Sequence, residues 1–209
     1  MTCMPLACTA ACVAFLGMDN NAMGQVNQKL DARRAVYTGS FDPVTLGHLH
    51  IIERAARLYE HLTVGVGVNA TKQSTFTTDE RLRLLEKVTE RFENVSVASF
   101  SGLAVDFVRQ CGAMVMVRGV RPLTDIAGEF TMMMANRQID GDLETVFLMA
   151  GEEFGHVSSS LIKQIAAMSN GRALEKFVPK EVISPLIEKM QSEKMQSDKT
   201  QSPIASDLS

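Results

Sequence analysis

Cysteine is scarce in this sequence outside its first residues. Of 4 cysteines, Cys3, Cys8 and Cys12 lie close to the N-terminus and only Cys111 lies in the rest of the chain. One cysteine cannot form an internal disulfide, so this part is typical of a protein from a reducing compartment, and we expect a cytoplasmic location. No Cys or His pair there has the spacing of metal ligands. We therefore expect no structural zinc and assign no residue as a metal ligand.

The sequence also lacks an excess of one charge and any long hydrophobic run. It has 21 Lys and Arg against 24 Asp and Glu, which gives a net charge of -3. Such a balance argues against binding to duplex DNA or to an anionic membrane surface. No run reaches the ~18 apolar residues that a membrane span needs. With 209 residues, of which 45% are hydrophobic, the chain fits one soluble globular domain.

The two ends of the chain differ from its middle. Residues 1–18 carry no charged side chain, but a signal peptide would have Lys or Arg before its apolar stretch. We favour instead an N-terminal extension over residues 1–33 that is disordered or precedes the true start. From Lys189 on, a Lys-Met-Gln-Ser pattern repeats every five residues, a period of neither helix nor strand. We expect residues 34–190 to form the domain and residues 191–209 a solvated low-complexity tail.

Apolar runs alternate with longer amphipathic stretches between these ends. The runs predict strands at 35–38, 62–68, 95–98, 114–117 and 145–149. The amphipathic stretches predict helices at about 47–60, 78–92, 103–111, 124–139, 158–169 and 179–190. This alternation indicates an α/β fold with a five-stranded parallel sheet and helices on both faces. Ligands of such sheets bind beyond the carboxyl ends of the strands, so polar residues that follow a strand are candidates for a site.

The longest polar motif, Tyr-Thr-Gly-Ser-Phe-Asp-Pro-Val-Thr-Leu-Gly-His, covers residues 37–48 after the first expected strand. Gly39 and Gly47 have no Cβ, so a ligand can approach their backbone closely. Gly47 and His48 fall at a helix start, where unpaired N–H groups and the helix dipole favour anions. His48 can donate a hydrogen bond to a phosphoryl oxygen there. The structural alternative is a tight turn with a capping histidine.

Basic residues follow the second and fourth expected strands. Lys72 lies in a polar loop, where a lysine is more often simply solvated. Arg118 and Arg121 flank a Gly-Val pair just after the fourth strand. Two guanidinium groups at that point can form a bidentate phosphate clamp. Alternatively, they are surface arginines that pair with Asp125 and Glu129.

A third polar motif, Phe-Gly-His-Val-Ser-Ser-Ser, covers residues 154–160 after the fifth expected strand. Serine is a common N-cap, so one of the three has a structural explanation. Three serines at a helix start offer several donors to one anion, as a polyphosphate requires. We interpret His156 as a contact residue. Four strand ends thus carry anion ligands, which predicts a phosphate-binding site.

One motif suggests a different class of function. Gly65-Val-Gly67-Val-Asn-Ala70 matches the relaxed G-x-G-x-x-A fingerprint of dinucleotide-binding folds. Both glycines lie inside an expected strand, however, and no helix begins at Ala70. An NAD-dependent oxidoreductase is therefore a weaker alternative, as is a nucleotide-binding protein without catalytic activity.

Residues 34–190 resemble the bacterial phosphopantetheine adenylyltransferases of the nucleotidyltransferase superfamily with a T/H-x-G-H motif. The resemblance rests on G-S-F-D-P-V-T-L-G-H, the Lys72 loop, R-G-V-R, Glu129 and V-S-S-S-L-I-K, in this order. It implies a Rossmann-like nucleotidyltransferase fold and the reaction of ATP with 4′-phosphopantetheine to give 3′-dephospho-coenzyme A and pyrophosphate, the penultimate step of coenzyme A biosynthesis. It also implies Mg²⁺ with ATP, a homohexamer, and feedback inhibition by coenzyme A.

The resemblance also implies which residues form the site. The residues that would bind phosphopantetheine are Ser40 (usually Thr in the family), Lys72, Ala104 and Arg118. The residues that would line the ATP site are Ser40, Phe41, His48, Gly119, Val120, Arg121, Glu129, Phe154, Gly155, His156, Val157, Ser158, Ser159 and Ser160.

We expect catalysis by electrostatic stabilisation. The attacking group is already an anionic phosphate oxygen, so no general base is needed for in-line displacement at the α-phosphorus. His48, Lys72 and Arg121 would stabilise the charge of the transition state. The nearest alternative keeps the fold and transfers AMP to nicotinate mononucleotide, or CMP to an alcohol phosphate. Those relatives usually carry His in place of Thr45 and lack R-G-x-R.

Overall fold

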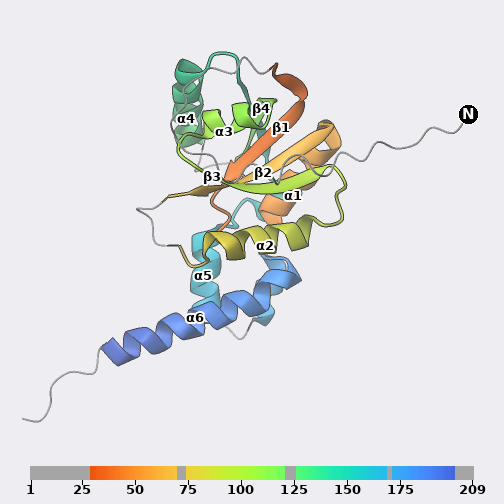
Figure 1. Ribbon diagram of the computed structural model, residues 1–209. Coiled ribbons are helices and arrows are strands. Elements are labelled where there is room, and N and C mark those ends of the chain that lie inside the picture. Colours follow the sequence, from red (N-terminus) through yellow and green to blue (C-terminus); the bar gives the residue numbers. More distant parts are fainter. Residues whose placement is uncertain (1–28, 70–73, 121–125, 169–170, 201–209) are drawn as a thin grey trace, which may run out of the picture.

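A single parallel sheet forms the centre of the protein. The computed structural model describes residues 29–69, 74–120, 126–168 and 171–200. Five strands pair in the order β3-β2-β1-β4-β5, all of them parallel (Figure 1). Their bounds are β1 Asp31–Gly39, β2 His61–Val68, β3 Val95–Ser101, β4 Ala113–Val120 and β5 Glu144–Met149. The five predicted strands and the α/β fold class are confirmed.

Helices cover both faces of the sheet. Those described are α1 Leu46–Leu58, α2 Thr78–Thr89, α3 Ala104–Gln110, α4 Ile126–Ile139, α5 Ser159–Met168 and α6 Lys180–Thr200, with short 3-10 helices η1 Glu152–Phe154 and η2 Arg172–Lys176. α3 and α4 lie on one face, and α1 and α2 lie on the other, where α5 and α6 extend the layer (Figure 1). All six predicted helices are confirmed, with ends shifted by a few residues except in α6.

Two apolar cores hold the layers together. The larger one joins the sheet to α1, α2, α5 and α6, and its fully buried members include Ile52, Leu85 and Leu186. The smaller one lies under α3, where Val105, Phe107 and Val108 pack against β1 and β4. The central strands β1, β2 and β4 have runs of buried residues, as expected of a parallel sheet covered by helices, whereas the edge strands β3 and β5 are mostly half-buried.

The strand order fixes where a ligand can bind. From β1 the chain adds β2 and β3 on one side of the sheet, and then crosses back to add β4 and β5 on the other side. The order therefore reverses between β1 and β4. In open α/β sheets, ligands bind in the crevice beyond the carboxyl ends of the strands at such a switch point. The ends of β1 and β4 carry Ser40 and Arg118, respectively.

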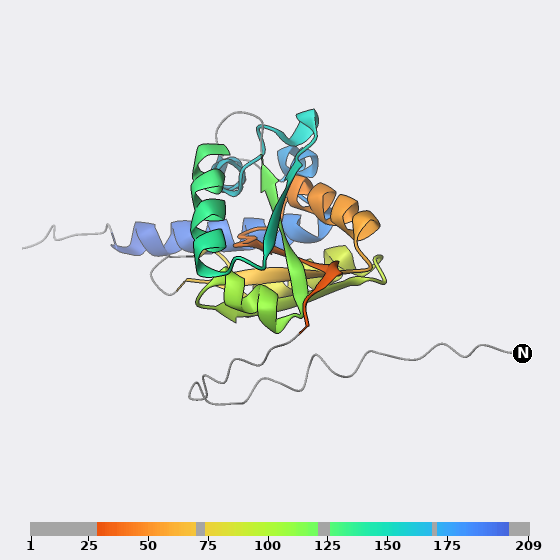
Figure 2. The ribbon, with the colours of Figure 1, turned by 90° about the horizontal axis from the view of Figure 1, so that it is seen from above.

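The ends of the domain differ from the expected boundaries. β1 begins at Asp31, before the expected start at residue 34. α6 continues to Thr200, well into the segment 191–209 that we expected to be a solvated tail. Lys, Glu, Met and Gln favour helix even without an apolar face, which explains this extension. The end of α6 projects away from the rest of the protein (Figure 1, Figure 2).

No described helix combines the length and the hydropathy that a membrane span requires. Residues 1–28 and 201–209 lie outside the described residues, and so do the expectations for these segments.

Candidate functional site

His48 caps the helix that follows β1. Thr45 is the N-cap of α1, and its hydroxyl accepts a hydrogen bond from the His48 N–H at 3.1 Å. In return, Nδ1 of His48 accepts from the Thr45 N–H at 3.1 Å. Because Nδ1 is an acceptor, the neutral ring carries its proton on Nε2, the tautomer that can donate to a phosphate oxygen. The capping interpretation of His48 is confirmed, and it is compatible with a role as donor.

The loop between β1 and α1 has an unusual backbone. Phe41 has a φ of 47°, in the left-handed region, and its side chain is buried. Its ring packs edge-on against Tyr37 and His48, with ring centroids 5.3 and 5.1 Å apart. The peptide bond between Asp42 and Pro43 is cis. A left-handed conformation at a bulky residue costs roughly 1–3 kcal/mol, so the surrounding contacts must hold this loop in place.

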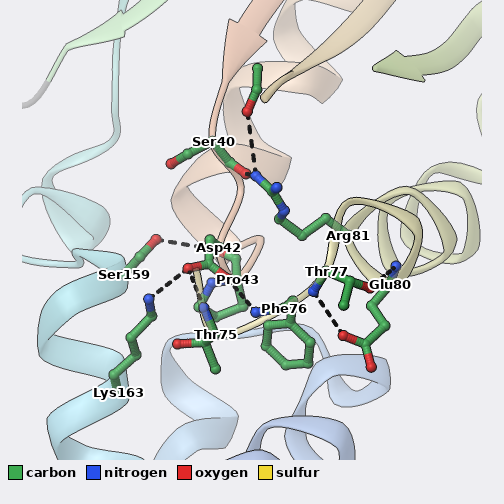
Figure 3. A network of polar contacts seen from close by, with 11 residues as sticks. Ser40, Asp42, Pro43, Thr75, Phe76, Thr77, Glu80, Arg81, Ser159 and Lys163 are labelled. Carbon is green, nitrogen blue, oxygen red and sulfur yellow. Dashed lines mark hydrogen bonds and ion pairs between the residues drawn. The ribbon is translucent and has the colours of Figure 1, made fainter. Parts of the chain in front are cut away.

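Asp42 and Arg81 supply such contacts, and sequence analysis did not find either residue (Figure 3). The buried guanidinium of Arg81 donates to the carbonyl oxygen of Ser40 at 2.9 Å and to that of Gly67 at 3.4 Å. It thereby joins the ends of β1 and β2. The buried carboxylate of Asp42 accepts hydrogen bonds from Thr75, Phe76 and Lys163. An aspartate before proline indicates a turn in sequence, but nothing local marks Arg81.

Arg118 joins β4 to β1 at the switch point. Its guanidinium donates twice to the carboxylate of Glu129, at 2.7 and 2.6 Å, and to the carbonyl and hydroxyl oxygens of Thr38, at 2.8 and 3.0 Å. Burial alone would lower the pKa of Arg118, but the hydrogen-bonded Glu129 carboxylate outweighs it and raises that pKa. The ion-pair alternative is therefore confirmed for Arg118 with Glu129. Asp125 lies outside the described residues.

A small pocket lies beside this ion pair. It has a volume of about 60 Å³ and lies between β4, α3 and α4. Its lining includes Ala104, Arg118 and Glu129, together with Met132 and Met133. The structure thus brings Ala104 and Arg118 together, as predicted for the phosphopantetheine site. It also places Glu129, which we expected at the ATP site, in the same pocket.

The start of α5 lies against the loop after β1. The hydroxyl of Ser158 accepts from the Leu161 N–H at 3.1 Å and so caps α5. The hydroxyl of Ser159 donates to the carbonyl oxygen of Pro43 at 3.1 Å, and Ser160 is exposed. The N-terminal ends of α1 and α5 are therefore neighbours. Two helix starts close together favour bound anions, through their N–H groups and their dipoles.

Phe154 makes a further contact with the start of α1. A Cβ built on Gly47 would lie 3.4 Å from the Cβ of Phe154. The ring of Phe154 also lies near His50 of α1, with centroids 5.3 Å apart. The segment before α5 and the start of α1 thus lie side by side, which brings the segment 154–160 next to the loop between β1 and α1.

Several predicted ATP-site residues pack against other parts of the protein. Val120 and Val157 are buried, so only their backbone groups can face a ligand. A Cβ on Gly119 would lie 3.0 Å from the Tyr37 hydroxyl, so the absence of a side chain at Gly119 serves packing. The ring of His156 packs edge-on against Phe177 at 5.9 Å. The predicted residues outside the described part of the chain are Lys72 and Arg121.

The glycines of the dinucleotide-like motif have a packing role. Gly65 and Gly67 both lie within β2. A Cβ on Gly65 would lie 2.5 Å from the ring of Phe107, so only glycine leaves room for that aromatic side chain of α3. The motif therefore forms no phosphate-binding turn, which removes the structural basis of the NAD-dependent alternative.

The comparisons with known proteins agree with this geometry. A family model described as Cytidylyltransferase-like matches residues 36–165. A phosphopantetheine adenylyltransferase from Rhodopirellula baltica is 66% identical over 157 residues, which are 75% of this chain and 88% of that protein. The chain belongs to the phosphopantetheine adenylyltransferase family.

Other phosphopantetheine adenylyltransferases match over a similar length. The protein of Symbiobacterium thermophilum is 49% identical over 156 residues, which are 75% of this chain and 95% of that protein. The protein of Clostridium botulinum strain Eklund 17B is 44% identical over 155 residues, or 74% and 96% of the two chains.

A solved structure from Vibrio parahaemolyticus, assigned as a nicotinate-nucleotide adenylyltransferase, has a TM-score of 0.57 at 15% sequence identity. The match covers 77% of this chain and 95% of that one. At this identity it shows that the two proteins share a fold.

Proposed function

We propose that this protein transfers AMP from ATP to 4′-phosphopantetheine, which gives 3′-dephospho-coenzyme A and pyrophosphate in the penultimate step of coenzyme A biosynthesis. The observation that carries the proposal is the reciprocal cap between Thr45 and His48, at 3.1 Å in each direction. It holds a donor imidazole at the start of α1, beside the start of α5. Membership of the phosphopantetheine adenylyltransferase family supports the same reaction.

The proposed step is an in-line displacement at the α-phosphorus of ATP. A phosphate oxygen of 4′-phosphopantetheine forms the new P–O bond, and the bond from the α-phosphorus to the bridging oxygen of pyrophosphate breaks. The main difficulty is to bring two anions together. The helix starts at His48 and Ser159 would hold the polyphosphate, and His48, Lys72 and Arg121 would donate to oxygens that gain charge in the transition state.

The phosphate of 4′-phosphopantetheine would bind at Arg118. In the structure, Glu129 already occupies the guanidinium with two hydrogen bonds. A phosphate can replace one or both of them, while Thr38 keeps the arginine in position. Ala104 lines the adjoining pocket and would contact the same substrate.

Mg²⁺ would enter with ATP. Among the described residues, no group of three or more His, Cys, Asp or Glu side chains could hold a metal ion. Mg²⁺ is commonly bound through substrate phosphates, waters and one or two carboxylates, so its entry with ATP would not require such a group. When bound, the ion would neutralise charge on the leaving pyrophosphate.

A homo-oligomer, namely a hexamer, is the proposed assembly. α4 has no buried residue, yet it carries large apolar side chains that are about half exposed. These side chains are Ile126, Phe130, Met132, Met134 and Ile139. Ile126, Phe130 and Met134 are each four residues apart and so form one apolar face of α4. An exposed apolar face of this kind is typical of a protein interface, and α4 lies at the periphery in both views (Figure 1, Figure 2). We also propose a cytoplasmic location and feedback inhibition by coenzyme A.

A pyrophosphate-release assay tests the function. Purified protein with Mg²⁺ and ATP should release pyrophosphate when 4′-phosphopantetheine is added, and should release little with nicotinate mononucleotide. Release with nicotinate mononucleotide alone would contradict the proposal in favour of the sibling reaction. Addition of coenzyme A to the same assay measures the proposed inhibition.

A further inference from the structure

We propose that Asp42 is a positioning residue for ATP. Its carboxylate fixes the loop between β1 and α1 against the starts of α2 and α5. It thereby sets the distance between the starts of α1 and α5, which hold the polyphosphate. The inference rests on the proposed function, because it assumes that ATP binds between these elements. We call Asp42, Thr75, Phe76 and Lys163 the Asp42 cluster (Figure 3).

The first connection of the Asp42 cluster leads to α2. One carboxylate oxygen of Asp42 accepts from the Thr75 N–H at 3.0 Å, and the other accepts from the Phe76 N–H at 2.8 Å. Phe76 is 1% exposed and belongs to the main core, directly before the N-cap Thr77. Two backbone donors on a rigid segment hold both oxygens of Asp42 in one orientation.

The second connection leads to α5. Nζ of Lys163 lies 2.7 Å from a carboxylate oxygen of Asp42, and the two side chains are 28% and 9% exposed. Lys163 is on α5, one turn after Ser159, whose hydroxyl donates to the Pro43 carbonyl oxygen at 3.1 Å. Asp42 and Pro43, which are adjacent in the loop, therefore contact the N-terminal end of α5 at two points. Ser40 and Phe41 directly precede these residues.

An effect of charge and an effect of geometry predict different results for variants of Asp42 and Lys163. A carboxylate close to a polyphosphate site repels the ligand, and Lys163 neutralises it. If only charge mattered, Asp42→Asn would strengthen ATP binding and Lys163→Met would weaken it. If the pair positions the helix starts, both variants weaken ATP binding, because each one breaks the same connection. If the pair serves only stability, neither variant changes the KM for ATP.

A matched control pair lies elsewhere in the chain. Nε of Arg109 and a carboxylate oxygen of Asp140 are 2.7 Å apart, and the two side chains are 34% and 14% exposed. These values are close to those of Lys163 and Asp42. Arg109 belongs to α3 and Asp140 follows α4, so the pair lies toward the strand starts, away from the proposed site. Asp140→Asn therefore removes a comparable ion pair without touching that site.

The experiment compares Asp42→Asn, Lys163→Met and Asp140→Asn with the wild-type enzyme. Pyrophosphate release is measured with ATP varied at saturating 4′-phosphopantetheine, and with 4′-phosphopantetheine varied at saturating ATP. The melting temperature of each protein is measured as well. We expect the first two variants to raise the KM for ATP about tenfold, with the KM for 4′-phosphopantetheine within about twofold of wild type. Asp140→Asn should lower the melting temperature and leave both KM values within about twofold.

Two results would overturn the inference. One is a lowered melting temperature with an unchanged KM for ATP in the Asp42 and Lys163 variants, and the other is a lowered KM for ATP in Asp42→Asn. If Asp42→Asn does not fold, Lys163→Met decides alone, and Lys163→Arg should restore part of the ATP affinity. Calorimetric titration of each protein with ATP separates this outcome from the proposed function, because it needs no turnover.

Discussion

At the scale of single residues, His48 has a structural role as a cap, and this role suits the chemical one proposed for it. The cap with Thr45 uses the backbone N–H and Nδ1 of His48, and so determines which ring nitrogen carries the proton. The sequence placed this residue at a helix start, and both interpretations of it were available from the motif. The tautomer of His48 could not be predicted from the motif, because it depends on a hydrogen bond that only the folded turn makes.

Replacement of His48 tests the catalytic part of this role. We expect His48→Ala to lower kcat at least ~100-fold at saturating substrates, because it removes one positioned donor. Turnover is measured by pyrophosphate release, and a thermal melt shows that the variant is folded. Near-normal turnover in a folded variant would remove His48 from the mechanism.

His61 at the start of β2 predicts a pH dependence of stability. Burial, with a smaller effect of the Arg34 charge, lowers the pKa of His61 below its ordinary value. His61 therefore becomes protonated at a lower pH in the folded state than in the unfolded state, where the pKa of a histidine is about 6.5. The contribution of neutral His61 to the free energy of unfolding is complete above about pH 6.5. It is lost as the pH falls from there through the pKa of His61 in the folded state.

Urea unfolding of the wild type and of His61→Gln, at pH 8 and at pH 5, measures this contribution. The wild type should lose more of its unfolding free energy than His61→Gln does over this interval. Equal losses in the two proteins would show that His61 does not contribute.

At the scale of elements, α1 and α2 both begin with a capping box, but only the box of α1 includes a proposed catalytic residue. Thr45 and His48 cap α1, and Thr77 and Glu80 cap α2, each with both hydrogen bonds of a capping box present. The second box has the Thr-x-x-Glu spacing that is typical of a capping box in sequence. The first was only an alternative, because histidine is not the usual partner of a capping threonine.

This pair of caps gives a matched experiment. Thr45→Ala and Thr77→Ala should each lower the unfolding free energy by about 1 kcal/mol, the usual cost of a lost N-cap. Only Thr45→Ala should also lower kcat, because only that cap orients a proposed catalytic side chain. Urea unfolding and pyrophosphate release provide the two readouts. An equal effect of both variants on kcat would contradict a catalytic role for the cap at α1.

Elements were easier to predict than the contacts between them. Apolar runs and amphipathic periods located the five strands and six α-helices of the described residues. They did not locate Asp42 as part of a site, because its partners Thr75 and Lys163 are 33 and 121 residues away in sequence. For the same reason the pairing of Arg118 with Thr38, 80 residues away, emerges only from the order of β1 and β4.

At the scale of the whole molecule, the fold explains why distant motifs lie at one edge of the sheet. The strand order reverses between β1 and β4, and the carboxyl ends of these strands carry Ser40 and Arg118. The alternation of strands and helices predicted that these motifs lie at this edge, although it did not predict the order of the strands. The length of α6 was misjudged, because the five-residue repeat after Lys189 has helix-forming composition without helical periodicity.

The apolar face of α4 predicts self-association. Phe130 is 53% exposed in the single chain, and Phe130→Glu should dissociate the oligomer by placing a charge in a desolvated interface. Met168→Glu is the control, since Met168 is 82% exposed on α5 and lies outside that face. Light scattering after size exclusion gives the mass of each protein. An unchanged mass for Phe130→Glu would show that α4 does not form the interface.

The most direct test of the central claim is a crystal structure with Mg²⁺, a non-hydrolysable ATP analogue and 4′-phosphopantetheine. We predict that polyphosphate oxygens lie within ~3.5 Å of Nε2 of His48 and of donors in the segment 158–160. We also predict that the phosphate of 4′-phosphopantetheine lies on Arg118 in place of Glu129. A polyphosphate bound elsewhere, with no phosphate oxygen near His48, would contradict the account.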